Sequence, residues 1–167
     1  MKLLNKSGFS LIEIMIVLAI VAVITMLVGT SKVLVTDIAM RLELDKLHAV
    51  CQYAQRYAMA SNCAQTITFN VSAHTYRFHD REEKLLSGVQ FGFIQGAKGP
   101  PAHPVSILSK PITFLEESIT FHPDGIMQAG TIYLVNAHKT RMYAISNAVS
   151  QVSHVRKYRY DGSWRLI

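Results

Sequence analysis

Residues 6–31 read KSGFSLIEIMIVLAIVAVITMLVGTS, and this stretch decides how the chain is organised. Between Phe9 and Ser31 the only charged residue is Glu13. At a rise of about 1.5 Å per residue, a helix over this run is about 34 Å long, enough to cross a hydrocarbon core of about 30 Å. The sequence therefore predicts a transmembrane helix over 9–31 and an extracytoplasmic domain in the rest of the 167 residues.

The residues before the apolar run do not resemble an ordinary secretory signal. Such a signal places its apolar stretch ahead of the cleavage site, whereas here a short basic segment with Lys2 and Lys6 ends at Gly8 and the apolar run follows. Cleavage after Gly8 would leave the predicted span on the mature protein. Positive charge ahead of a first span keeps that end in the cytoplasm, so the remainder is expected outside it.

Lys6-Ser7-Gly8 followed by Phe9-Ser10-Leu11-Ile12-Glu13 resembles the prepilin signal of type IV pilins and secretion pseudopilins. The resemblance implies a leader over 1–8, cleavage between Gly8 and Phe9 by a prepilin peptidase, and N-methylation of Phe9 by the same enzyme. It also implies that Glu13 docks the subunit into a filament by pairing with the amino group of Phe9 on a neighbouring subunit.

The carboxylate of Glu13 has two possible interpretations. A carboxylate in an apolar span costs a few kcal/mol in lipid, which points to a functional partner. The alternative is that Glu13, close to the mature N-terminus, extends to the headgroups and has no partner.

Helical periodicity continues beyond the apolar run. Apolar residues recur in steps of three and four on one face, and polar residues form a stripe that we expect on the opposite face. The sequence predicts one helix from Phe9 to about Ala60, with 32–60 as its amphipathic half; the alternative is an anchor followed by a separate helix. The apolar face comprises Met40, Leu44, Leu47, Cys51, Ala54 and Ala58, and the polar stripe comprises Arg41, Asp45, His48, Gln52 and Gln55.

Residues 61–167 change to alternating, β-rich segments separated by turns, so the fold class expected is α+β, with a long helix packed on an antiparallel β domain. Residues 120–125 (TFHPDG) and 130–134 (GTIYL) resemble the H-type minor pseudopilins of type II secretion and the T- and U-type minor pilins. These carry a β-rich sandwich after the helix. The ending DGSWR at 161–165 departs from their commoner glycine-arginine pair. Expected strands cover 66–69, 75–78, 89–94, 112–122, 131–136, 142–146, 152–160 and 163–167.

No motif for an enzyme, a cofactor or a metal is found in the sequence. P-loop, GxSxG and HExxH signatures are absent, and the Cys and His spacing does not suit zinc. Cys51 and Cys63 could form a disulfide in an exported domain, or one could be a buried thiol and the other a loop thiol.

A basic, aromatic hairpin is predicted around Asp161-Gly162. If these two residues form the loop, Tyr160 faces Ser163 and Arg159 faces Trp164, which would make a cation–π pair. Basic residues interleaved with aromatic ones also suit contact with single-stranded DNA, and the alternative is a solvated strand. The candidate DNA-binding residues are Arg156, Lys157, Arg159, Trp164 and Arg165.

The function expected from the resemblance is that of a non-enzymatic minor pseudopilin, at or near the tip of the periplasmic filament of a type II secretion system. Its partners would be the prepilin peptidase, other pilin or pseudopilin subunits, the inner membrane and secreted substrate. The alternative is a minor type IV pilin for pilus assembly or DNA uptake. A third hypothesis is a signal-anchored exported protein that joins no filament.

Overall fold

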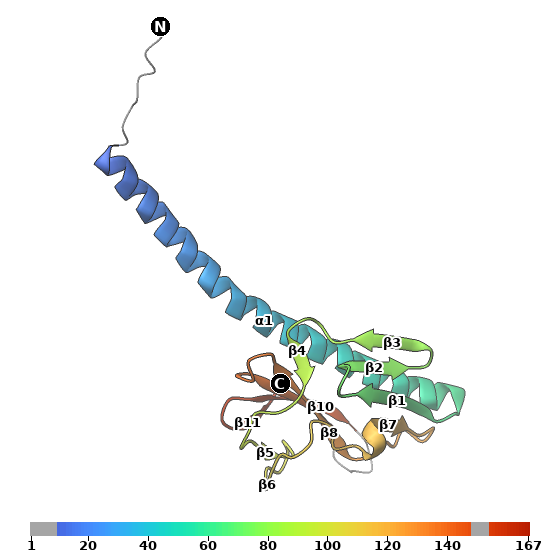
Figure 1. Ribbon diagram of the computed structural model, residues 1–167. Helices are drawn as coiled ribbons and strands as arrows, with labels where there is room; N and C mark the ends of the chain where they lie inside the picture. Colours follow the sequence, from blue (N-terminus) through green and yellow to red (C-terminus); the bar gives the residue numbers. More distant parts are fainter. Residues whose placement is uncertain (1–9, 148–153) are drawn as a thin grey trace. The chain divides into compact units, whose positions relative to one another are not determined.

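The computed structural model describes residues 10–147 and 154–167. The chain divides into two compact units, Met1–Val35 and Thr36–Ile167. The helix α1 (Leu11–Ser61) includes residues of both units (Figure 1). Its bounds agree with the predicted long helix from Phe9 to about Ala60.

Antiparallel strands build the second unit, as the α+β prediction requires. The four-stranded sheet has the order β3-β2-β1-β7, the five-stranded sheet has the order β11-β10-β9-β8-β4, and β5 pairs with β6 alone. The first sheet comprises β1 (Gln65–Asn70), β2 (Thr75–Phe78), β3 (Arg81–Lys84) and β7 (Ser118–Phe121), with a short 3₁₀ turn, η1 (Leu115–Glu117), before β7. The others are β4 (Val89–Phe91), β5 (Lys98–Gly99), β6 (Ser106–Ile107), β8 (Gly130–Asn136), β9 (Met142–Asn147), β10 (Val155–Tyr160) and β11 (Trp164–Leu166).

The main core lies between the second half of α1 and the two larger sheets. The predicted apolar face of the helix is buried throughout, and every one of its six residues is at most 1% exposed. It packs against side chains of both sheets, among them Ile67 of β1, Ile119 of β7 and Ile145 of β9. Burial of this face, at about 25 cal/mol per Å² of apolar surface, is what holds the helix to the sheets.

The polar stripe of α1 was predicted to lie opposite the core. The structure instead places it along the flank of the helix, next to the sheets. Lys157 Nζ donates to Asp45 Oδ1 at 2.7 Å, and Gln55 Nε2 donates to the Gly125 carbonyl at 2.8 Å. The His48 ring nitrogen Nε2 lies 3.2 Å from the Val155 carbonyl. The stripe is therefore the edge by which the helix is tied to β10 and to the turn at 122–125.

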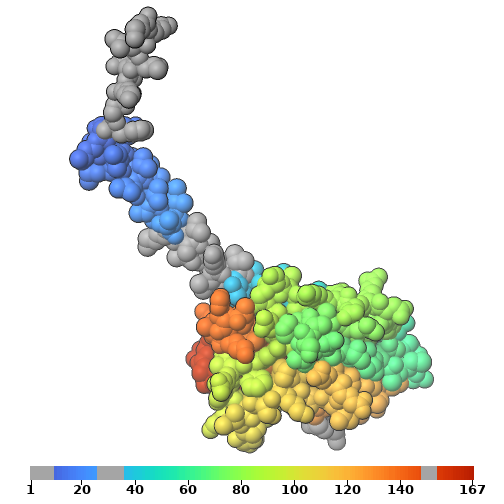
Figure 2. Space-filling model, in the orientation of Figure 1, coloured from blue at the N-terminus to red at the C-terminus, as the bar shows by residue number. Residues whose placement is uncertain are grey.

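A second core covers the other face of the five-stranded sheet. β8 and β9 are buried along almost their whole length because Leu108 and Ala97, in the segment between β4 and η1, pack over Tyr133 and its neighbours. This segment forms part of the surface of the unit in Figure 2, where it is yellow-green to yellow. Gly99 belongs to it, and any side chain there would collide with Leu108 and Tyr133.

Candidate functional site

The predicted processing site lies outside the described residues, which begin at Ser10, so the roles of Gly8 and Phe9 stay predictions. Glu13 lies in the first turn of α1 and is exposed. Its backbone N–H donates to the Ser10 carbonyl at 3.0 Å. A carboxylate at this position also lies favourably in the field of the helix dipole.

The start of α1 presents apolar side chains on every side. A helix that is hydrophobic all round is stable only in apolar surroundings, either lipid or other helices. Thr25 fits such surroundings because its hydroxyl lies 2.9 Å from the carbonyls of both Val21 and Ala22. The exposed large residues are Leu11, Ile12, Ile14, Met15, Ile16, Val17, Leu18, Ile20, Val21, Val23 and Ile24.

Within the described part of the chain, no helical stretch combines the length and the hydropathy needed to cross a bilayer.

The two cysteines are unpaired. Cys51 is buried in the helix face that packs on the sheets, and Cys63 is exposed just after the helix ends. The ten steps along the helix from Cys51 to Ser61 rise by about 15 Å, far beyond the roughly 7 Å that a disulfide spans between Cα atoms. The possible disulfide is therefore not formed. Burial raises the pKa of the Cys51 thiol to about 12.

The C-terminal hairpin has a different register from the predicted one. Its loop has three residues, Asp161-Gly162-Ser163, closed by a 3.1 Å hydrogen bond from the Asp161 N–H to the Ser163 carbonyl. Gly162 adopts a φ of 80°, which glycine accepts without strain. Tyr160 therefore faces Trp164, and Arg159 faces Arg165. The predicted cation–π pair of Arg159 and Trp164 is wrong.

The candidate DNA-binding residues of the hairpin do not form one surface. Lys157 pairs with Asp45, and Arg159 Nε lies 2.9 Å from Asp161 Oδ2, so both cations are balanced by carboxylates. Arg156 and Arg165 are exposed but project from opposite faces, because Arg156 alternates with Lys157 and Arg159 along β10.

Trp164, the aromatic member of that set, is engaged within the domain. Its ring centroid lies 5.0 Å from that of Tyr160 and 5.8 Å from that of Tyr133. Its Nε1 donates to the Lys98 carbonyl at 2.6 Å. These contacts give DNA binding no support, and DNA binding stays a prediction.

The face of α1 that points away from the core carries a stripe that the sequence reading missed. We call it the outer stripe: Ile38, Leu42, Ala49, Tyr53 and Tyr57, spaced at intervals of four and seven residues. All five are exposed, Ile38 to 65% and Tyr53 to 58%. Beside them Tyr53 meets Phe78 edge to face at 6.0 Å between ring centroids, and Tyr57 meets His79 at 5.2 Å. The same periodicity count that identified the core face could have found this stripe.

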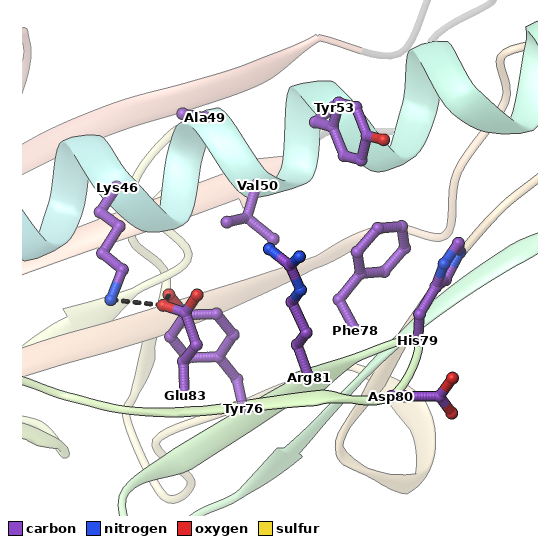
Figure 3. Close-up of a pocket in the computed structure, with 10 residues that line it drawn as sticks. All are labelled: Lys46, Ala49, Val50, Tyr53, Tyr76, Phe78, His79, Asp80, Arg81 and Glu83. Carbon is purple, nitrogen blue, oxygen red and sulfur yellow. Dashed lines mark hydrogen bonds and ion pairs between the residues drawn. The ribbon is translucent and has the colours of Figure 1, made fainter.

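A groove of about 710 Å³ lies between this side of α1 and the β2–β3 hairpin. Figure 3 shows Val50 and Tyr53 above it, Tyr76 and Phe78 below it, and Arg81 rising from β3 toward the helix. Lys46 Nζ and Glu83 Oε2 close one end with an ion pair of 2.5 Å. The Lys46 ammonium, hydrogen-bonded to Glu83, lowers the pKa of that carboxyl.

Glu43 supports the groove from within. Its side chain is fully buried, and Oε2 accepts a hydrogen bond from the Leu86 N–H at 3.1 Å, which holds the chain directly after β3. Oε1 has no hydrogen-bond partner among the described residues. Burial raises the pKa of Glu43, and the hydrogen bond from Leu86 and the charge of Lys46 oppose that shift.

A long N-terminal helix whose second half packs on an antiparallel β domain is the architecture of a type IV pilin-like protein. A model of the prokaryotic N-terminal methylation motif matches residues 3–29, where such a protein carries its processing signal. A model of the type II transport protein GspH matches residues 43–150, more than half of the chain. The chain therefore belongs to the GspH family. No curated protein and no solved structure matches it.

Proposed function

We propose that this chain is a minor pseudopilin, a non-enzymatic structural subunit of the periplasmic filament of a type II secretion system, and that it supports protein secretion from a position at or near the filament tip. Membership of the GspH family and the methylation motif support the pseudopilin role. The tip position rests on the resemblance to minor subunits alone.

The observation that carries the proposal is the all-round apolar surface at the start of α1, interrupted by the single carboxylate of Glu13. Before assembly the inner membrane would surround these side chains, and in the filament neighbouring helices would replace the lipid. Since lipid tails are as apolar as leucine, this exchange yields little hydrophobic energy, and packing and charge terms decide the register. Because the carboxylate of Glu13 costs a few kcal/mol in lipid, its pairing with a cation would contribute most to the stability of the assembled state.

The cation that we propose for Glu13 is the amino group of Phe9 on a neighbouring subunit. Cleavage after Gly8 would create this amino group, and N-methylation would keep it basic. The match of residues 3–29 to the methylation motif supports both steps. Lys2 and Lys6 favour an orientation with the N-terminus in the cytoplasm and Thr36–Ile167 in the periplasm.

Substitution of Glu13 tests this function. In cells with an active secretion system we expect Glu13→Ala to be processed normally and to remain in the membrane. Its amount in sheared filaments should fall by about tenfold, the factor for about 1.4 kcal/mol, because the mutant is cheaper to keep in lipid and has lost its ion-pair partner. Glu117→Ala, which removes an exposed carboxylate from the β domain, is the control and should enter filaments like the wild type.

Two outcomes would contradict the proposal in different ways. Equal incorporation of Glu13→Ala and wild type would remove the docking role of Glu13. Absence of the wild-type chain from filaments, with the filament itself intact, would remove the subunit function.

A further inference from the structure

We propose that the groove between the outer stripe of α1 and the β2–β3 hairpin docks an amphipathic helix of a different filament subunit, which presents a carboxylate to Arg81. This inference names a partner for the proposed pseudopilin and therefore rests on that function.

The walls of the groove have the composition of a protein interface. Tyr53 and Phe78 supply aromatic surface in the groove, and Tyr57 continues that surface along the exposed face of α1. Aromatic side chains and arginine are enriched where proteins bind one another, and they dominate the binding energy when a partner excludes water from them. Exposed apolar side chains recur along the helix from Ile38 to Tyr57, interrupted by Asp45 and Lys46, and a face of this kind favours a contact.

The charges of the groove call for an acidic partner. Lys46 and Glu83 form an ion pair, and the carboxylate of Asp80, which also lines the groove, points away from Arg81 (Figure 3). The side chain of Arg81 forms no ion pair or hydrogen bond with any described residue, although its charge acts on the Glu83 carboxylate and it lines the groove beside apolar and aromatic side chains. Arg56, exposed on α1 between Tyr53 and Tyr57, likewise has no carboxylate partner in the described part of the chain. A carboxylate brought to Arg81 would form charge-assisted hydrogen bonds, and arginine favours a bidentate geometry.

The shape of the surface favours a helix over a strand. The outer stripe repeats with helical spacing, and the small side chain of Ala49 at its centre permits a second helix to approach closely. Addition of a strand would have to use the free edge of β3, which is four residues long and consists entirely of charged residues. Short, charged edge strands resist pairing with another strand. The partner should therefore carry apolar residues at positions i and i+4 and an aspartate or glutamate within one turn of them.

Photocrosslinking from Tyr53 tests the inference in the full-length protein. A photoreactive phenylalanine analogue replaces Tyr53, whose side chain is exposed, and crosslinked peptides from cells with the secretion system are identified by mass spectrometry. We expect an adduct to a helical peptide of another subunit with the spacing and the carboxylate described above. Arg81→Glu should reduce the adduct by roughly tenfold, since reversal of this charge would repel the carboxylate of the partner.

Lys84→Glu is the matched control. It reverses a charge in the same strand, but Lys84 alternates with Arg81 and Glu83 and so projects from the other face of the hairpin. The adduct should be unchanged in Lys84→Glu. In the Arg81→Glu background, replacement of the identified carboxylate of the partner by arginine should restore the adduct. Circular dichroism of each variant verifies that the domain is folded.

The outcomes separate this inference from the proposed function. An adduct to a second copy of this chain, an adduct to nucleic acid, no adduct at all, or an adduct that Arg81→Glu leaves unchanged would overturn the inference. If the wild-type chain is still found in sheared filaments, the subunit function stands without it. The predicted adduct in cells where the chain never enters filaments would support the groove and overturn the filament function.

Discussion

The carboxylate of Glu43 accepts a hydrogen bond from the backbone N–H of Leu86, 43 residues further along the chain. Through this bond a fully buried acidic side chain of α1 fixes the segment that follows β3. A charge at such a place is costly unless it is fully paired, and Oε1 of Glu43 has no partner among the described residues. The stability of the domain should therefore depend on the protonation of this group.

The pH dependence of that stability has a definite sign. Because the pKa of Glu43 is raised by burial, the folded state binds its proton more tightly than the unfolded chain does. The contribution of Glu43 to the free energy of unfolding is therefore fully present below about pH 4.5 and is lost as pH rises through the folded-state pKa. Glu43→Gln cannot titrate, so its free energy of unfolding relative to wild type should increase with pH across this window.

Denaturant titrations followed by the fluorescence of Trp164, the single tryptophan, measure this difference. Glu82, whose pKa is lowered by hydrogen bonds, titrates in both proteins and cancels in the comparison, whereas Glu83 cancels only in part because its charge acts on Glu43. Glu43→Ala should instead be destabilised at every pH by about 1–3 kcal/mol, because the Leu86 N–H loses its acceptor. A constant difference between Glu43→Gln and wild type from pH 4 to 8 would contradict the prediction.

Processing of the N-terminus should depend on Gly8. A residue without a side chain lets a peptidase approach the backbone closely, and Gly8→Leu removes that access. We expect the variant to insert into the membrane but to keep residues 1–8, with no methyl group on Phe9. Intact mass measured on the purified full-length protein reports both changes. Ser7→Ala is the control and should be cleaved; a wild-type protein that begins at Met1 would refute the processing signal.

Thiol reactivity should distinguish the two cysteines. Cys63 is exposed, so a maleimide should label it in the native protein, whereas Cys51 is buried with a pKa of about 12 and should react only after unfolding. Cys63→Ser should therefore abolish native labelling, and Cys51→Ser should leave it unchanged. Mass spectrometry counts the labels. Loss of two hydrogens from the unlabelled protein would instead reveal a disulfide.

The C-terminal hairpin should bind DNA weakly if it binds at all. With Lys157 and Arg159 paired to carboxylates, only Arg156 and Arg165 are available for phosphates. The log–log salt slope of binding should then have a magnitude of no more than about 1.4 to 1.8, the value for two contacts. Arg165→Gln should lower it by about 0.7 to 0.9, and Lys157→Gln should not change it. A slope of about 3 that Lys157→Gln reduces would restore the DNA hypothesis.

The elements with a strong periodic signal were predicted well. The buried face of α1 and the hairpin of β1 and β2 follow directly from steps of three and four and from strict alternation. β3 was not predicted because all four of its residues, REEK, are charged. An edge strand of this kind has no alternation of apolar and polar residues by which it could be recognised. The expected strand over 112–122 is interrupted by η1, where Glu116 and Glu117 adopt positive φ values that no propensity rule predicts.

Contacts between residues that are far apart in the sequence could not be predicted from the sequence. Nothing local in Asp45 indicates that it meets Lys157, and nothing in Trp164 indicates that its N–H binds Lys98. The predicted register of the C-terminal hairpin was wrong because the loop has three residues and not two. That one-residue difference shifted the partner of Tyr160 from Ser163 to Trp164 and the partner of Arg159 from Trp164 to Arg165.

The ties between α1 and β10 also bear on the order in which the protein is made. The helix is complete by Ser61, but the strand that holds its polar flank, through the pairing of Asp45 with Lys157, emerges from the ribosome about a hundred residues later. Contacts of such long sequence separation form late and slow the folding of a domain. Until the last strands arrive, the apolar face of the helix lacks its final cover, and this interval is when a newly made chain is most exposed to aggregation.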